Sequence, residues 1–404
     1  MIHRLSLSVA IASTGLLLLL ACGDDNPAAP VPGPTLSFQT FQAASVVIGQ
    51  NNMTSGLENK GGAASASSLF GAWGAPAPGS LYVPDPLNNR ILGFNSIPTS
   101  NGASADFVLL QPNFTTTSLG LSATKGRRIF DVCTAGGKLF AVDNENSRVL
   151  IWNSLPTTTN VPADVVVGQP NFTTNTVATA QANMNGPARA IAAGGKLFVS
   201  DRGNNRVLIW NTIPTVNGQP ADVVVGQSDF VSTSVSLSAT SFGSAAGLWS
   251  DGKRLVVGES QHQRVLIWNS IPTTNGAPAD VVVGAPNMTT AGGAPASATS
   301  IGDPVAVTSD GKSLFVSDGA YSRVLIYTPF PTSNGAAATT VLGQSNFTLN
   351  TGNDPNQDGV TDGFSAKTFA GGGNSPNGLR VIGNQLFVGD FSNSRVLIFD
   401  GTLK

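Results

Sequence analysis

Residues 187–210 read Pro-Ala-Arg-Ala-Ile-Ala-Ala-Gly-Gly-Lys-Leu-Phe-Val-Ser-Asp-Arg-Gly-Asn-Asn-Arg-Val-Leu-Ile-Trp, and segments of this form occur six times in the chain. Each copy places an acidic residue five positions before an arginine. The six pairs are Asp85 and Arg90, Asp143 and Arg148, Asp201 and Arg206, Glu259 and Arg264, Asp318 and Arg323, and Asp390 and Arg395. The arginines are separated by 58, 58, 58, 59 and 72 residues. Such a period indicates a repeat architecture, in which one unit cannot bury its apolar faces alone.

The third copy predicts four short strands bounded by Gly, Pro and Asn turn signals. They span residues 187–193, 196–200, 206–210 and 222–226. The run Val-Leu-Ile-Trp is apolar at every position rather than at alternate ones, so both faces of that strand should be covered by neighbouring sheets. Four antiparallel strands repeated six times predict an all-β fold, a six-bladed β-propeller.

The two ends of the repeat region predict how the ring closes. The sixth copy stops after Arg395-Val-Leu-Ile-Phe399 and lacks the Val-Val-Val-Gly-Gln strand of the other copies. An orphan copy of that strand, Ser45-Val-Val-Ile-Gly-Gln50, precedes the first full repeat. We therefore expect residues 45–50 to complete the last blade, which would leave no sheet edge open between the ends. The propeller would then span residues 44–404.

The unit Pro187-x-Arg-Ala-Ile-Ala-x-Gly-Gly-Lys-Leu-Phe-Val-Ser-Asp201-x-x-Asn-Asn-Arg206-Val resembles the NHL repeat, a blade type of six-bladed propellers. The resemblance covers about residues 44–404. It implies the fold, and it implies a function among ligand-binding modules, sensor ectodomains and, more rarely, lyases. The repeat is longer than the 40–45 residues of a compact blade, and the extra residues fall in the links that follow the third and fourth strands.

The N-terminal residues have the features of a targeting segment. Arg4 is followed by an apolar run, and Leu19-Leu20-Ala21-Cys22 resembles the lipobox of bacterial lipoproteins. This predicts a signal peptide over 1–21 with Cys22 as the acylated residue; the alternative is an ordinary secretory signal in which Cys22 is incidental. Residues 22–43, rich in Pro and Ala, would form a tether. The expected location is the bacterial cell envelope, at the outer membrane or cell surface, with membrane contact through the lipid anchor only.

Composition narrows the class of partner. The net charge is −2, charged residues make up 11% of the chain, and no basic run occurs, which argues against a nucleic-acid partner. A surface built from Ser, Thr, Asn, Gln and Gly suits a neutral protein or polysaccharide ligand. Besides Cys22 the chain has one cysteine, Cys133, which lies in an apolar stretch and is expected to be a buried thiol.

The 72-residue interval contains an insertion with the pattern of a calcium loop. It reads Asp354-Pro-Asn-Gln-Asp-Gly-Val-Thr-Asp362. Oxygen ligands at positions 1, 3, 5, 7 and 9, with Gly at 6, are what such loops require. The predicted ligands are Asp354, Asn356, Asp358, the carbonyl of Val360, and Asp362. Calcium would order the loop rather than take part in catalysis; the alternative is an acidic turn without metal.

The repeated acidic–arginine pairs are expected to be structural, because a catalytic site needs asymmetry. His262 is the only histidine beyond the signal segment, which excludes a histidine-ligated zinc site. It occupies a turn next to Glu259. The simpler interpretation is an exposed turn residue; the alternative is that His262 and Glu259 act together as a general acid–base pair.

The starts of the first strands differ between repeats, and we expect them to share one rim with the turns between second and third strands. The candidate ligand residues on this rim are Arg127, Arg128, Asp131, Arg189, His262, Asp303 and Asn377. The expected function is a binding module that recognises a protein or polysaccharide through these loops. The alternatives are a calcium-dependent lactonase or lyase, with Asp131, Asp303 and Asn377 around a metal in the central channel, and a purely architectural envelope protein.

Overall fold

The computed structural model describes residues 34–72, 81–371 and 375–404. Contacts divide the chain into a segment ending at Pro34 and a compact unit, Thr35–Lys404, which contains all the strands discussed below. None of the helices in the described ranges has the length and apolar character needed to cross a membrane. Cys22 and the signal segment lie outside the described residues.

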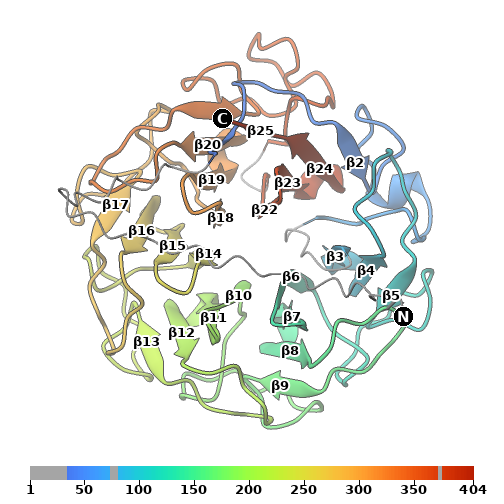
Figure 1. Cartoon of the computed structure of the whole chain (residues 1–404), viewed down its shortest axis with the longest axis vertical. Coiled ribbons are helices and arrows are strands. Elements are labelled where there is room, and N and C mark those ends of the chain that lie inside the picture. Colours follow the sequence, from blue (N-terminus) through green and yellow to red (C-terminus); the bar gives the residue numbers. More distant parts are fainter. Residues whose placement is uncertain (1–33, 73–80, 372–374) are drawn as a thin grey trace, which may run out of the picture. The chain divides into compact units, whose positions relative to one another are not determined.

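Six sheets are arranged in a ring, and each forms one blade (Figure 1). Blade one contains β3 (Leu81–Asp85), β4 (Arg90–Phe94) and β5 (Phe107–Leu109), and blade two contains β6 (Ile129–Ala135), β7 (Lys138–Asp143), β8 (Arg148–Trp152) and β9 (Val165–Val167). Blade three contains β10 (Arg189–Ala193), β11 (Lys196–Asp201), β12 (Arg206–Trp210) and β13 (Val223–Val225), and blade four contains β14 (Ala245–Ser250), β15 (Leu255–Glu259), β16 (Arg264–Trp268) and β17 (Val281–Val283). Blade five contains β18 (Ala306–Ser309), β19 (Leu314–Asp318), β20 (Arg323–Tyr327) and β21 (Thr340–Leu342), and blade six contains β22 (Gly378–Ile382), β23 (Gln385–Asp390), β24 (Arg395–Asp400) and β2 (Val46–Ile48).

These sheets confirm the predicted all-β propeller and place the strands of the third repeat within a residue or two of the expected positions. All pairings within the blades are antiparallel, and in the five blades described with four strands the first strand lies nearest the axis (Figure 1). In blade one, residues 73–80 immediately before β3 lie outside the described residues. Short 3-10 turns join second and third strands in five blades: η2 (Pro86–Asn88), η3 (Asn144–Asn146), η4 (Arg202–Asn204), η5 (Gly319–Tyr321) and η6 (Phe391–Asn393). A further 3-10 turn, η1 (Glu58–Gly61), precedes blade one.

The ring closes as the sequence predicted. Strand β2 pairs with β24 in antiparallel register, with Val46 opposite Ile398 and Ile48 opposite Val396. A second closure was not predicted: β1 (Leu36–Ser37) pairs with β25 (Thr402–Leu403). The two chain ends of this unit are therefore joined at two separate ladders.

The links after the third strands explain part of the extra length of the repeat. In blade four, Asn275 Oδ1 accepts a hydrogen bond from Val224 N at 3.1 Å, and Gly276 N donates to Val224 O at 2.9 Å. Val224 lies on β13, the outermost strand of blade three, so the link occupies a sheet edge that would otherwise expose unpaired backbone groups. The same contacts recur in other blades; at the ring closure Phe41, with φ 57°, takes the glycine position and donates to Val341 O at 3.0 Å.

Candidate functional site

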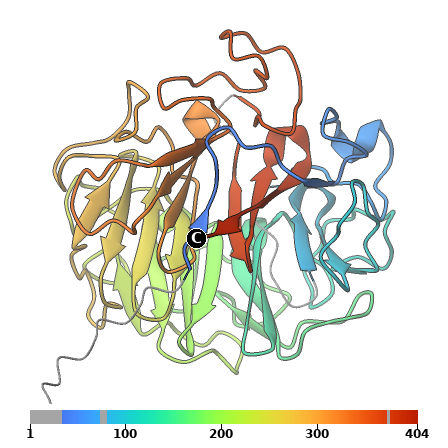
Figure 2. The same ribbon diagram turned by 45° about the horizontal axis from the view of Figure 1, so that its top comes forward.

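The starts of the first strands and the second-to-third turns share one rim, as expected. In blade two, Glu145 N donates to Arg127 O and Asn144 N donates to Arg128 O, each at 3.2 Å. Equivalent contacts join Gly203 to Asn185 in blade three and Gly319 to Asp303 in blade five. We term this face the turn rim. The long link between β21 and β22, orange-red in Figure 2, projects from one face of the molecule.

All six acidic–arginine pairs are present, with N···O distances of 2.5 to 2.9 Å and side chains that are fully buried. In blade three, Arg206 Nε donates to Asp201 Oδ2 at 2.7 Å. Its two terminal nitrogens donate to four carbonyls, which belong to Thr179, Ala180, Asn183 and Phe230. All five guanidinium donors therefore have partners. We term the acid, the arginine and these carbonyls the blade hub.

The hub organises the links of the turn rim. Asp201 accepts from Asn185 N at 2.7 Å and from Asn204 Nδ2 at 2.9 Å, so the carboxylate also holds the entry to the first strand and the turn. Arg206 binds the link that enters its blade through Asn183 O and the link that leaves it through Phe230 O. A buried charge pair with every hydrogen bond satisfied is a scaffold element.

Two of the predicted rim residues form an exposed cationic hollow. The Nε atoms of Arg127 and Arg128 contact the two carboxylate oxygens of Glu145 at 2.5 and 2.9 Å, and each arginine side chain is 47% exposed. With Leu87, Asn89 and Leu119, these residues line a hollow of about 260 Å³. Because a single carboxylate lies between the two guanidinium groups, some of their N–H donors remain on the solvent side.

Three other residues expected on the rim are not at the surface. Asp131, Arg189 and Asn377 are 3%, 4% and 0% exposed. The reason is their place on the narrow inner edge of the ring, where side chains meet across the axis. In blade two the register of β6 shifts between Ile129 and Asp131, which the sequence pattern does not reveal. Asn377 carries an amide whose Oδ1 and Nδ2 both lack a hydrogen-bond partner.

Arg189 and Arg380 cross the channel. From blade three, Arg189 donates to carbonyls of three other blades: Phe130 at 3.4 Å, Val305 at 3.2 Å, and Asn377. From blade six, Arg380 Nη2 donates to Val132 O at 3.0 Å. Among the described residues, two long cationic side chains therefore cross the axis, where the alternative reading of the sequence expected carboxylates to converge on a metal.

Asp131 is the acidic group of this cluster. Its Oδ1 lies 3.9 Å from Arg380 Nη2, and Arg189 also acts on it. Burial raises the pKa of Asp131, and the two arginines oppose that rise. Burial lowers the pKa of Arg189 to about 10, so it remains a cation at neutral pH. Two cations beside one carboxylate disfavour a metal ion at this point, and the described residues contain no group of three or more His, Cys, Asp or Glu side chains placed to hold one.

Asp303 does not join the axial cluster. It is half-buried, and the groups that act on its carboxyl include Ser260 of blade four and Arg202 of blade three. Burial raises the pKa of its carboxyl, and Ser260 and Arg202 oppose the rise. The set Asp131, Asp303 and Asn377, expected for an axial lactonase or lyase metal, is therefore divided between different surroundings.

His262 belongs to the hub of blade four. Its Nδ1 contacts Glu259 Oε1, while Glu259 Oε2 accepts from Arg264 Nε at 2.5 Å and its Oε1 also accepts from Gly243 N at 2.9 Å. Glu259 is fully buried, and the His262 side chain is 17% exposed. A carboxylate held by an arginine and a backbone amide is engaged in structure, so this pair gains no support as a general acid and base.

The predicted calcium loop is folded on its own amides. Asp354 is buried and accepts from Gly359 N at 2.8 Å and from Asp358 N at 3.2 Å. Asp358 Oδ1 accepts from Val360 N at 2.9 Å, and Asn356 Nδ2 donates to Asp358 Oδ2 at 3.2 Å. Gly359, with φ 91°, makes the sharp turn expected of position 6. In this described part of the chain no group of three or more His, Cys, Asp or Glu side chains is placed to hold a metal ion, and calcium binding stays a prediction.

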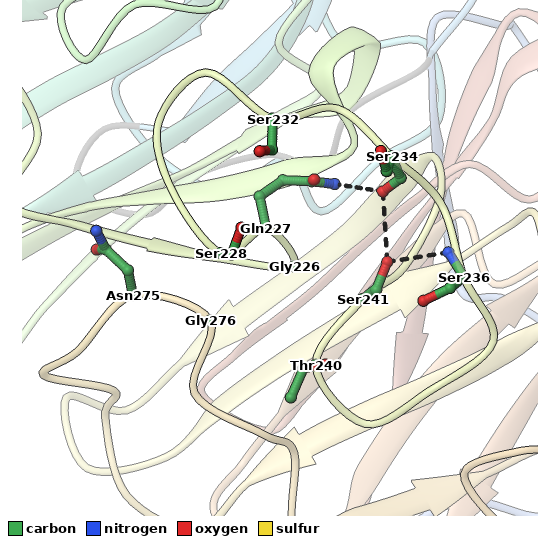
Figure 3. Close-up of a pocket in the computed structure, with 10 residues that line it drawn as sticks. All are labelled: Gly226, Gln227, Ser228, Ser232, Ser234, Ser236, Thr240, Ser241, Asn275 and Gly276. Carbon is green, nitrogen blue, oxygen red and sulfur yellow. Dashed lines mark hydrogen bonds between the residues drawn. The ribbon is translucent and has the colours of Figure 1, made fainter.

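A hollow lies between the link that follows β13 in blade three and the link that follows β16 in blade four (Figure 3). It measures about 390 Å³ and is lined by Gly226, Gln227, Ser228, Ser232, Ser234, Ser236, Thr240, Ser241, Asn275 and Gly276. Gln227 Nε2 fixes its wall by donating to Asn205 O and Ser234 O, each at 2.9 Å. Every lining residue is a glycine or an uncharged hydrogen-bonding residue. Sequence reasoning placed extra residues in this link and did not identify a site there.

No family model and no curated protein matches the chain, so the expected NHL assignment has no such support. Solved structures do show similarity. An aldose sugar dehydrogenase from Streptomyces coelicolor, in its PQQ-bound form, has 12% identity and a TM-score of 0.45, covering 93% of this chain and all of the other. A candidate 6-phosphogluconolactonase from Bacteroides uniformis has 13% identity and a TM-score of 0.44, covering 84% and 85% of the two chains. The WD40 propeller domain of Doa1 has 10% identity and a TM-score of 0.43, covering 91% and 96%. Similarity at this level carries no argument about activity.

Proposed function

We propose that this protein is an exported binding module, tethered through an acyl group on Cys22, that recognises a polysaccharide or protein partner on the turn rim. The observation that carries the proposal is the 390 Å³ hollow between Gln227 and Gly276, which has the size of ligand sites in other proteins. Its wall of hydroxyl and amide groups matches a neutral, hydroxyl-rich ligand better than a charged or apolar one.

The size of the axial cavity supports the same proposal. A catalytic site needs reactive groups facing a cavity that admits a substrate, whereas the cavity beside Arg189, Arg380 and Asp131, in the described part of the axis, measures only about 10 Å³. The single histidine of the described unit is held in a hub. These arrangements support recognition by the rim loops better than catalysis at the axis. The Arg127–Arg128 hollow would add a surface that binds acidic groups on the same partner.

A matched pair of substitutions tests the ligand site. Ser234 lies in the wall of the hollow, and Thr176 occupies the corresponding position one repeat earlier without lining it. Both are exposed and both give their carbonyl to the repeated glutamine. We expect Ser234→Trp to weaken binding at least tenfold on a glycan array and in pull-downs from envelope extract, and Thr176→Trp to leave it unchanged. Equal binding by both variants would place recognition elsewhere.

The anchor has its own test. Metabolic labelling with a radioactive fatty acid should label the wild-type chain, and Cys22→Ser should abolish the label and release the protein from the membrane fraction. Repeating the pull-down with calcium and with a chelator would show whether the loop 354–362 contributes. A label that persists in the Cys22→Ser variant would contradict the proposed tether.

A further inference from the structure

We propose that the hollow at Arg127 and Arg128 binds the carboxylate of a uronic acid residue, so that the polysaccharide recognised by this protein is an acidic one. The inference rests on the proposed function, because it names the chemical class of the partner. Three observations carry it: side chains that occur only in blade two among the six repeats, backbone strain at one arginine, and the arrangement of the charges.

The first observation is that blade two departs from the repeat at three neighbouring positions. Arg127 N donates to the hub acid Asp143 at 2.7 Å, and the entry to every other first strand makes the same bond. Where blade two has Arg127-Arg128, the other repeats carry Phe70-Gly71, Asn185-Gly186, Gly243-Ser244, Gly302-Asp303 and Ala370-Gly371. Where it has Glu145, they carry Leu87, Gly203, Gln261, Ala320 and Ser392. The scaffold therefore requires neither the two cations nor the acid between them.

The second observation is the backbone strain at Arg128. Its φ is 56°, in the left-handed region, and at the same position blades one and three have Gly71 and Gly186, with φ 78° and 54°. An L side chain is strained in this region, whereas glycine is not. Asn89 Oδ1 holds the residue there by accepting from Arg128 N at 2.9 Å. Strained residues of this kind cluster at ligand sites, and this one brings a second guanidinium group to the hollow.

The third observation is the arrangement of the charges. Glu145 contacts Nε of Arg127 at 2.5 Å and Nε of Arg128 at 2.9 Å, through a different oxygen in each case. Within the described residues, no terminal nitrogen of either arginine donates a hydrogen bond. The three side chains together carry one net positive charge, which a single carboxylate would balance while accepting from the planar guanidinium donors. A phosphate group would bring a second negative charge close to Glu145.

The walls of the hollow favour a sugar acid over a peptide. The hollow measures about 260 Å³, and Leu87 and Leu119 give it apolar sides that suit the C–H face of a pyranose ring. Apart from Leu119, every lining residue already donates its backbone N–H within the protein. A peptide main chain would therefore find at most one backbone donor there. A uronate residue needs only the two arginines for its charged group.

Paired polysaccharides test the ligand class with the whole chain in biolayer interferometry. The probes are polygalacturonate, polyglucuronate and polymannuronate, each compared with the same polymer after its carboxyl groups are reduced to alcohols. We expect the wild type to bind at least one acidic polymer about tenfold more tightly than its reduced form. Arg127→Gln and Arg128→Gln should each abolish that preference, because Glu145 then neutralises the one remaining arginine. Lys253→Gln removes an exposed positive charge elsewhere and should keep the preference.

The contrary outcomes are distinct. Wild-type binding without a preference for any acidic polymer, or a preference that persists in both arginine variants, would overturn the uronate assignment and leave the proposed function standing. No binding to any polymer, acidic or reduced, would overturn both for polysaccharides. Polyglutamate bound as tightly, with the same loss in the variants, would identify a peptide partner instead. A preference that appears only after Asp24→Asn and Asp25→Asn would show that the hollow holds acidic groups of the chain itself.

Arg128→Gly separates a ligand role from a structural one. The change removes the guanidinium group and the strain together, so the preference for the acidic polymer should be lost while Tm stays at or above the wild-type value. Ser244→Gly makes the same backbone change at the corresponding position of blade four, where φ is 53°, and should leave the preference intact. A clear fall in Tm for Arg128→Gly, or unchanged binding of the acidic polymer, would contradict the role proposed for Arg128.

Discussion

Arginines inside the ring occur in two settings, fully buried at the blade hubs and buried or partly exposed at the axis. In the hub of blade three, Arg206 has a carboxylate at 2.7 Å and partners for all five donors. At the axis, Arg189 and Arg380 share Asp131, and Arg380 Nε has no partner. The hub is repeated and pairs one acid with one arginine, whereas the axial cluster occurs once in the described residues and places two arginines near one aspartate. The comparison teaches that the repeated positions form the scaffold, while residues that depart from the repeat have surroundings of their own.

The largest effect is expected from removing the residues that complete the last hub. Arg395 donates to Met53 O at 2.7 Å, and β2 supplies the fourth strand of that blade. Deletion of residues 35–53 should therefore abolish cooperative unfolding in urea, because blade six loses a strand and a hub partner together. Deletion of residues 23–33, outside the compact unit, is the control and should leave the urea midpoint unchanged. A cooperative transition in the larger deletion would show that the hubs do not need ring closure.

A substitution in a complete hub should have the next largest effect. Asp201→Asn leaves the Arg206 charge buried without its partner and should lower the free energy of unfolding by about 3–5 kcal/mol. Asp222→Asn, an exposed carboxylate of the same blade that accepts one bond from Asn211 N, should cost less than about 1 kcal/mol. Similar losses for the two variants would remove the distinction between hub and surface carboxylates.

The comparison extends to a repeated position without charge. Gly276 has φ 63°, and an added Cβ would lie 3.3 Å from Gln227 O. Gly276→Ala should lower the unfolding free energy by about 1–2 kcal/mol, because an L side chain is strained in this region. Phe41 occupies the same position at the ring closure, so Phe41→Gly should relieve strain while losing the contact with Lys367. Stability gained by Gly276→Ala would contradict the assigned turn.

The smallest expected effect is a difference in the chemical reactivity of Cys133, which lies near the axial cluster. The thiol is buried, and burial raises its pKa to about 12, with Arg380 opposing the rise. In the Cys22→Ser chain it is the only thiol, and at pH 8 iodoacetamide should modify it only as the protein unfolds. Alkylation of the native protein at the rate of a free cysteine would show that the region of the axis opens readily.

Much of the fold could be predicted because the determining residues repeat. The six acidic–arginine pairs, the apolar third strands and the orphan strand at 45–50 were sufficient for six blades and their closure. The pairing of β1 with β25 could not be foreseen, since Leu36–Ser37 and Thr402–Leu403 occur in no other repeat. The Asn-Gly link that follows the third strand was predicted to be a turn. Its hydrogen bonds to the outermost strand of the preceding blade appear only in the three-dimensional structure.

The candidate site was less predictable, because its residues are the exceptions to the repeat. Periodicity places Arg189 and Asp131 near the start of a first strand but does not show whether they face solvent or the axis. Arg380 was missed; the available signal was a charged residue within an inner strand. The hollow beside Gln227 depends on how two links approach each other, which sequence spacing does not encode.

The most direct test of the contrast between hub and axis is the free energy of unfolding of Arg206→Gln and Arg380→Gln, measured in urea. We predict that Arg206→Gln loses at least about 3 kcal/mol, since a buried carboxylate and four carbonyls lose their partner. Arg380→Gln should lose less than about 0.5 kcal/mol or gain stability, because Asp131 keeps Arg189 as its counter-charge. Equal losses in the two variants would contradict the division of these arginines into hub and axial settings.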